Sequence, residues 1–148
     1  GDILMLDTGL VHDGYFCDYD RNFAVGEAKP AAQSAHAALL DATQAGFEAA
    51  KTGATAADLF HAMNAVLTRH GGATDAGRLG HGLGMQLTEW PSLIPTDHTV
   101  LEPGMVLTLE PGIETRDGAI MVHEENIVVT ESGPVRLSPF ASGPLPVI

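Results

Sequence analysis

The order of the expected elements predicts an α+β fold with an antiparallel sheet. Two extended segments come first, two helical segments follow, and the remaining segments are typical of strands. This order differs from the alternation of strands and helices that builds a parallel sheet. The chain has 148 residues, which suits one domain or part of one, because domains commonly span roughly 100–200 residues.

The first two expected strands form a hairpin. A short apolar run over residues 3–6 predicts a buried strand that ends at Asp7. Residues 12–14, His-Asp-Gly, predict a tight turn. Residues 15–23 then alternate as a returning strand, with Cys17 on one face. The opposite face carries Phe16, Asp18 and Asp20.

Two helices are expected next. The first spans residues 30–51, opens with Pro30 and is rich in Ala, Leu, Gln and Glu. The second begins at Thr55, where Asp58 three residues later predicts a near capping box. Further extended segments are expected at residues 80–87, 106–110 and 119–130, and the last is interrupted by His-Glu-Glu-Asn at 123–126.

Composition and charge exclude several classes of function. The formal charge of −12 argues against nucleic acid and against an anionic membrane surface as partners. No apolar run approaches the ~20 residues that a membrane span needs. A single cysteine, Cys17, cannot form an internal disulfide, which suits a reducing compartment, and a cytoplasmic location is expected. Because a strand follows Gly1-Asp2 directly, we expect the chain to be part of a larger domain.

Acidic residues interrupt otherwise apolar strands. An ionised carboxylate in a core costs several kcal/mol unless it is paired or binds a metal. The chain has only 7 Lys and Arg for 19 Asp and Glu, so few cations can neutralise these acids. Two divalent ions would change the formal charge from −12 to −8. The acids are Asp7, Asp18, Glu110 and one of Glu124 and Glu125, and the candidate cations are Arg21, Arg116 and Arg136.

His81 is the one candidate imidazole ligand. It lies in Gly-His-Gly-Leu-Gly at residues 80–84, where glycines leave the ring unobstructed. An oxygen-rich set with one imidazole suits Mn, Fe or Co and does not exclude Zn. Each feature has a structural alternative: a lone histidine is often structural, Asp7 fits turn chemistry, and Asp18 with Asp20 fits the solvated face of an edge strand.

Five segments, in this order, resemble the pita-bread metallopeptidases, which include aminopeptidase P, prolidase, methionine aminopeptidase and the non-peptidase creatinase. The resemblance covers nearly the whole chain, and the Leu-Glu-Pro-Gly-Met…Glu-Pro-Gly stretch is its most specific part. It implies a curved antiparallel sheet covered by helices. The segments are residues 7–9, 17–23, 80–84, 101–112 and 123–126.

The resemblance implies five ligands for two divalent metal ions, Mn being expected and Co, Zn or Fe being alternatives. Asp7 would chelate one ion, and Asp18 and Glu124 would bridge both. His81 and Glu110 would bind the other ion. In the family pattern this glutamate precedes a threonine by six residues. Thr130 stands at that place here, so the match selects Glu124 rather than Glu125. The ligands are Asp7, Asp18, His81, Glu110 and Glu124.

The resemblance also implies a reaction. A hydroxide bridging the two metals would attack the scissile carbonyl, and Glu110, with His81, would carry the catalysis, Glu110 as proton shuttle. The function implied is a Xaa-Pro aminopeptidase or dipeptidase acting on peptides. Two alternatives stay open: a non-peptidase relative that hydrolyses a small C–N compound or acts as a lyase, and a non-catalytic binding relative.

The chain departs from the family pattern at three points. Thr88 stands where a second histidine follows the metal-binding one by seven residues, and a hydroxyl cannot replace its acid chemistry. Asp20 stands where a threonine is usual, so an additional ligand or a supporting carboxylate is expected there. Trp90, just beyond Thr88, is a candidate pocket residue. The third departure is that the upstream half of the catalytic domain, with a further histidine, and any N-terminal domain lie outside residues 1–148. Relatives are often dimers, so a homodimer is a further expectation.

Overall fold

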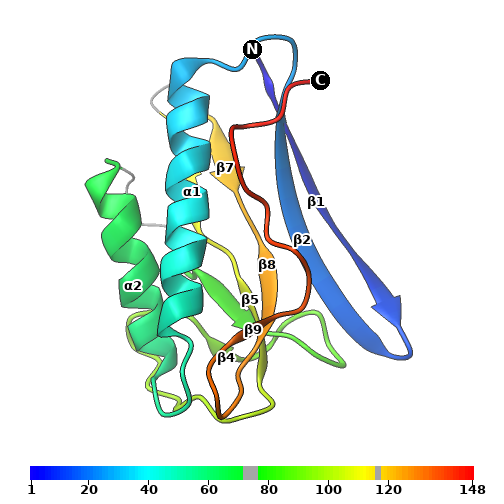
Figure 1. Cartoon of the computed structure of the whole chain (residues 1–148), viewed down its shortest axis with the longest axis vertical. Coiled ribbons are helices and arrows are strands. Elements are labelled where there is room, and N and C mark those ends of the chain that lie inside the picture. Colours follow the sequence, from blue (N-terminus) through cyan, green and yellow to red (C-terminus); the bar gives the residue numbers. More distant parts are fainter. Residues whose placement is uncertain (72–76, 116–117) are drawn as a thin grey trace.

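The computed structural model describes residues 1–71, 77–115 and 118–148. Within them, two long strands are followed by two helices and then by short strands (Figure 1). The elements are β1 (Ile3–His12), β2 (Tyr15–Ala24), α1 (Pro30–Ala49), α2 (Ala56–Arg69), β3 (Gly80–Gly82), β4 (Glu89–Ser92), β5 (Val106–Leu109), β6 (Gly112–Glu114), β7 (Ile120–Val122), β8 (Glu125–Val128) and β9 (Val135–Arg136).

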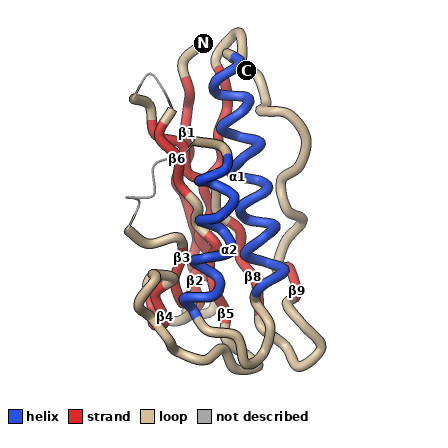
Figure 2. Tube along the Cα trace, turned by 90° about the vertical axis from the view of Figure 1, so that its left-hand side faces the viewer, coloured by secondary structure: helices blue, strands red, loops and turns tan. Residues whose placement is uncertain are grey.

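The described strands form three groups, in which every pairing is antiparallel. Strands β1 and β2 make a hairpin, β6 and β7 make a second pair, and the others form a sheet in the order β4-β3-β5-β8-β9. Helix α1 packs beside α2 and contacts β5, β6 and β7, so the two helices and the strands form separate layers (Figure 2). The predicted α+β class with antiparallel pairing is confirmed.

The hairpin is longer and more exposed than expected. Asp13 and Gly14 form the turn with φ of 50° and 87°, as a type I′ turn requires. Strand β1 continues through Asp7 to His12 instead of ending there. The prediction that residues 3–6 are buried is wrong, since Leu4 and Leu6 are 41% and 45% exposed. The reason is that β1 is an outer strand, and β2 lies between it and β8.

Strand β2 follows the predicted alternation. Asp18 and Asp20 are buried on one face, whereas Cys17 on the other face is only partly buried. Helix α2 begins as expected, because Thr55 and Asp58 form a complete capping box with each other's backbone N–H. The apolar core then fills the space between helices and sheet, where side chains such as Leu59 of α2 and Leu107 of β5 are fully buried. None of the described helices is long and apolar enough to cross a membrane.

Strand β3 requires glycine on both sides of its histidine. Gly80 has φ of 144°, a conformation that L side chains rarely adopt. A Cβ atom on Gly82 would collide with the backbone carbonyl of Trp90 in β4. At both positions beside His81, the backbone of a neighbouring strand is so close that only the hydrogen of a glycine fits.

We expect Gly82→Ala to lower the free energy of unfolding by about 2 kcal/mol or more, because backbone atoms rather than a flexible side chain must move. Gly112→Ala is the matched control, since its Cβ would meet Val122 at an ordinary 3.6 Å. Urea unfolding of both variants measures the difference, and equal stabilities would show that β3 and β4 are not tightly apposed.

Candidate metal centre

Side-chain hydrogen bonds hold strand β2 against the start of β8. The amide of Asn126 accepts from the backbone N–H of Asp18 at 3.1 Å and donates to the backbone carbonyl of Asp18 at 2.7 Å. Arg21 Nη1 donates to the carbonyl of Glu124 at 2.6 Å. These bonds cross from the hairpin to the sheet, and they bring the acidic face of β2 to Glu124.

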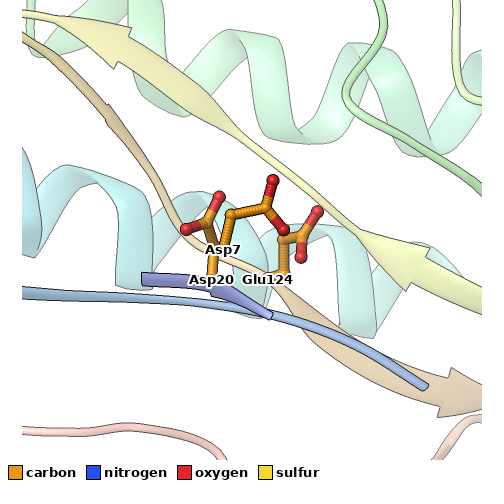
Figure 3. A group of neighbouring side chains, drawn as sticks. All are labelled: Asp7, Asp20 and Glu124. Carbon is orange, nitrogen blue, oxygen red and sulfur yellow. The ribbon is translucent and has the colours of Figure 1, made fainter. Parts of the chain in front are cut away.

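Three carboxylates converge where the hairpin meets the sheet (Figure 3). Asp7 and Asp20 are direct partners in the β1–β2 register, and Glu124 lies between β7 and β8. One oxygen from each side chain lies within 4.8 Å of the others. This separation is short enough for one cation to contact all three.

His81 and Glu110 flank Asp18 from the other side. His81 Nε2 lies 3.7 Å from Asp18 Oδ2 and 3.8 Å from Glu110 Oε2. His81 Nδ1 is 2.7 Å from the carbonyl of Gly82, so Nδ1 carries the proton and donates it there. Nε2 is then left with its lone pair toward the two carboxylates, as a metal ligand requires.

The paired glutamates have different environments although both are buried. Both carboxylate oxygens of Glu125 accept from Arg21 Nη2 at 3.0 Å, and Oε1 accepts further bonds from His123 and the backbone N–H of Ala141. Glu124 joins the carboxylate group, and its Oε2 has no hydrogen-bond partner among the described residues. The residue periodicity left this choice open, and the geometry favours Glu124 as the ligand.

Burial and mutual repulsion raise the pKa of four acids at this site, Asp18, Asp20, Glu110 and Glu124. Burial is the largest cause for Asp20, whose pKa rises to about 7, with Asp7 adding to it. Burial and then Asp18 raise the pKa of Glu124 to about 9. The pKa values of Asp18 and Glu110 also rise through burial, although His81 and Arg78 beside them oppose the rise. The cluster therefore disfavours its own charge unless a cation is present.

The candidate cations serve other partners. Arg21 pairs with Glu125, whereas Arg136 lies over Phe140 and donates to Gln44, so the expectation that it neutralises a strand acid is not met. Arg116 lies outside the described residues. Sequence reasoning overlooked Arg78, whose Nη2 is 3.6 Å from Glu110 Oε2. Its position three residues before His81 was the available signal.

Thr88 and Trp90 lie apart from the acidic group. Thr88 is exposed in the bend before β4. Trp90 is 69% exposed, donates to Thr99 and borders a shallow hollow with Tyr15 and Met85. None of the five expected ligands lines that hollow.

The sequence matches a model of metallopeptidase family M24 over residues 1–131. The chain belongs to this family. The Xaa-Pro dipeptidase of Pyrococcus furiosus is 34% identical over 140 residues, which cover 93% of this chain and 40% of that protein. The Xaa-Pro dipeptidase of Lactobacillus helveticus is 36% identical over 133 residues, 89% of this chain and 36% of that protein.

Solved structures confirm the M24 fold. Prolidase from Pyrococcus furiosus superposes with a TM-score of 0.89 at 33% identity. The superposition covers 96% of this chain and 42% of the prolidase chain. Methionine aminopeptidase from Rickettsia prowazekii gives 0.81 at 26% identity, over 92% of this chain and 64% of that one. The predicted pita-bread fold is confirmed. The chain spans about 40% of the length of the curated relatives it matches.

In protein treated with a chelator, we expect the melting temperature to fall as the pH rises from about 5 to 9. Folding raises the pKa of Asp20 from 3.8 to about 7 and that of Glu124 from 4.5 to about 9, so the folded M24 chain binds their protons more tightly than the unfolded chain does. The stabilisation from these two protons is complete below the pKa values of the unfolded chain. It is lost as the pH rises through the pKa values of the folded chain.

Thermal melts at half-unit pH steps measure this trend. Saturating Mn²⁺ should flatten it, because the ion replaces the protons as the neutralising charge. A melting temperature that rises toward pH 9 in the chelated protein would contradict the expectation.

Glu125→Gln and Glu124→Gln form a matched pair with opposite expected effects. The first leaves Arg21, partly buried, without its carboxylate, and should cost about 2–4 kcal/mol of unfolding free energy. The second replaces an acid whose pKa is raised to about 9 by a neutral amide of the same shape, and should leave the chelated protein as stable or more stable. Urea unfolding in a chelator measures both, and equal losses would contradict the distinction.

Proposed function

We propose that the protein is a dinuclear metal-dependent peptidase that cleaves peptides at Xaa-Pro bonds. Asp7, Asp18, His81, Glu110 and Glu124 are its proposed metal ligands. The observation that carries the proposal is that residues from five segments of the sequence converge on one acidic site with His81 Nε2 directed at it. Asp18, Asp20 and Glu124 are buried there, whereas Asp7 is exposed at its edge. Membership of M24 and the similarity to Xaa-Pro dipeptidases support the choice of substrate.

The side chains present suit two divalent ions. Among the described residues, one buried oxygen each of Asp20, Glu110 and Glu124 has no hydrogen-bond partner, which is the condition that a cation would relieve. A set rich in carboxylates with one imidazole favours hard or borderline ions, and we propose Mn²⁺ as the natural one. Asp18 would be the ligand that the two ions share, since it is close to both His81 and Glu124.

The chain's own residues would position and move a proton. The ions would supply a water molecule of lowered pKa and polarise the substrate carbonyl. Glu110 is suited to take up and return a proton, because burial raises its pKa and its side chain is 26% exposed toward solvent. Arg78, 3.6 Å from Glu110, would limit that rise and keep the carboxylate available as a base.

A second candidate function is hydrolysis of a small C–N compound or a lyase reaction on the same site. Thr88 favours it, because an exposed hydroxyl takes the place at which the resemblance expects a second histidine. A panel of Xaa-Pro dipeptides against small amides and amidines separates the two functions. Turnover confined to the small compounds would replace the peptidase assignment.

The proposed function predicts close to two Mn²⁺ per chain after loading and desalting, measured by elemental analysis. Asp18→Asn should lower both the metal content and the hydrolysis of Xaa-Pro dipeptides by at least tenfold, because a shared ligand is lost. Asp41→Asn removes an exposed charge on α1 and is the control. Unchanged metal content in Asp18→Asn would refute the ligand assignment.

A further inference from the structure

Asp20 faces Asp7 directly across the hairpin. The two residues are partners in the antiparallel register. Asp20 is buried on the face of β2 that turns toward the sheet, whereas Asp7 on β1 is exposed. Like charges placed directly opposite each other destabilise a strand pair. Glu124 approaches from the sheet, and the three carboxylates turn toward one another (Figure 3). The hairpin register therefore forces a concentration of negative charge that something else must offset.

The Asp20 carboxylate is buried and incompletely partnered. The residue is only 3% exposed, and its Oδ1 has no hydrogen-bond partner among the described residues. The adjacent Arg21 does not bond to this carboxylate, because its guanidinium bonds to Glu125 and to the carbonyls of residues 20 and 124. A purely structural carboxylate at such a site would be expected to have donors around it, as Glu125 has.

We propose that Asp20 is a direct ligand of the divalent ion held by Asp7 and Glu124, which makes it a sixth protein ligand of the centre. The inference rests on the proposed function, since it needs the other five ligands to bind metal. It concerns a position at which the family pattern described above usually has a neutral threonine.

A sixth ligand changes the charge of the centre. Five carboxylates carry one negative charge more than two divalent ions neutralise, whereas four carboxylates would balance them. The extra oxygen should tighten the ion beside Asp7 and favour ions that accept many oxygen ligands, such as Mn²⁺, over ions that prefer four-coordinate sites, such as Zn²⁺.

The test measures Mn²⁺ binding by the electron paramagnetic resonance signal of the free ion, for the wild-type protein, Asp20→Asn and Asp20→Thr. We expect both variants to bind the tighter of two ions at least tenfold more weakly and the second ion nearly as before. Asp41→Asn loses the same charge from the exposed face of α1 and should bind both ions as the wild type does.

Thermal melting supplies an independent readout. Without metal, Asp20→Asn should melt at the same or a higher temperature than the wild type, because one repelling charge is gone. The increase in melting temperature on adding Mn²⁺ should be smaller in the variant. A carboxylate with only a structural role would instead lower the melting temperature in both conditions, and that outcome, or failure of both variants to fold, overturns the proposal.

Asp18→Asn, measured in parallel, separates the two proposals. If the wild type binds two ions, Asp18→Asn loses them and both Asp20 variants bind normally, Asp20 is not a ligand and the proposed function stands. If the wild type binds no Mn²⁺, or Asp18→Asn binds it unchanged, the proposed function fails and the assignment of Asp20 fails with it.

Discussion

The docking of strand β2 against the start of β8 is the interaction on which the acidic centre depends. Asn126 bonds to both backbone groups of Asp18 and so replaces a pair of ladder hydrogen bonds with a side-chain amide. Arg21 adds a bond to the carbonyl of Glu124. These contacts join segments more than a hundred residues apart in sequence. Because they bond to the backbone beside each acid, they set the acids' separation without neutralising the carboxylates themselves.

The two adjacent buried glutamates differ in their partners and therefore in the direction of their pKa shifts. Burial alone would raise the pKa of Glu125, but bonds from His123 and the backbone of Ala141, with the charge of Arg21, hold that pKa below its usual value. Burial and the charges of neighbouring acids raise the pKa of the adjacent Glu124. One glutamate is thereby an anchor for the hairpin, whereas the other is available to a cation. The irregular backbone between β7 and β8 is what lets adjacent residues both be buried and yet face different partners.

Charge explains why the centre suits metal ions better than an ion-pair network. The chain has 7 basic side chains of Lys and Arg against 19 acidic ones. Arg21 and Arg136 are held by structural contacts, and Arg78 lies beside Glu110 at one edge of the centre. Tight glycine packing around His81 then fixes its ring, and the bond to Gly82 selects the tautomer. Contacts of other groups, and not of the ligand carboxylates themselves, therefore hold the side chains of the centre in position.

Local patterns were sufficient for the hairpin turn at Asp13, the capping box at Thr55 and the antiparallel α+β class, because each depends on neighbouring residues. The family motifs identified the candidate ligands for the same reason, because each motif consists of residues that are close together in the sequence. Tertiary structure alone decided that β1 is exposed, that Arg21 serves Glu125 and that Arg78 reaches Glu110. These depend on which strand lies outermost and on the register between distant segments, and both follow from packing of the whole chain rather than from any local pattern.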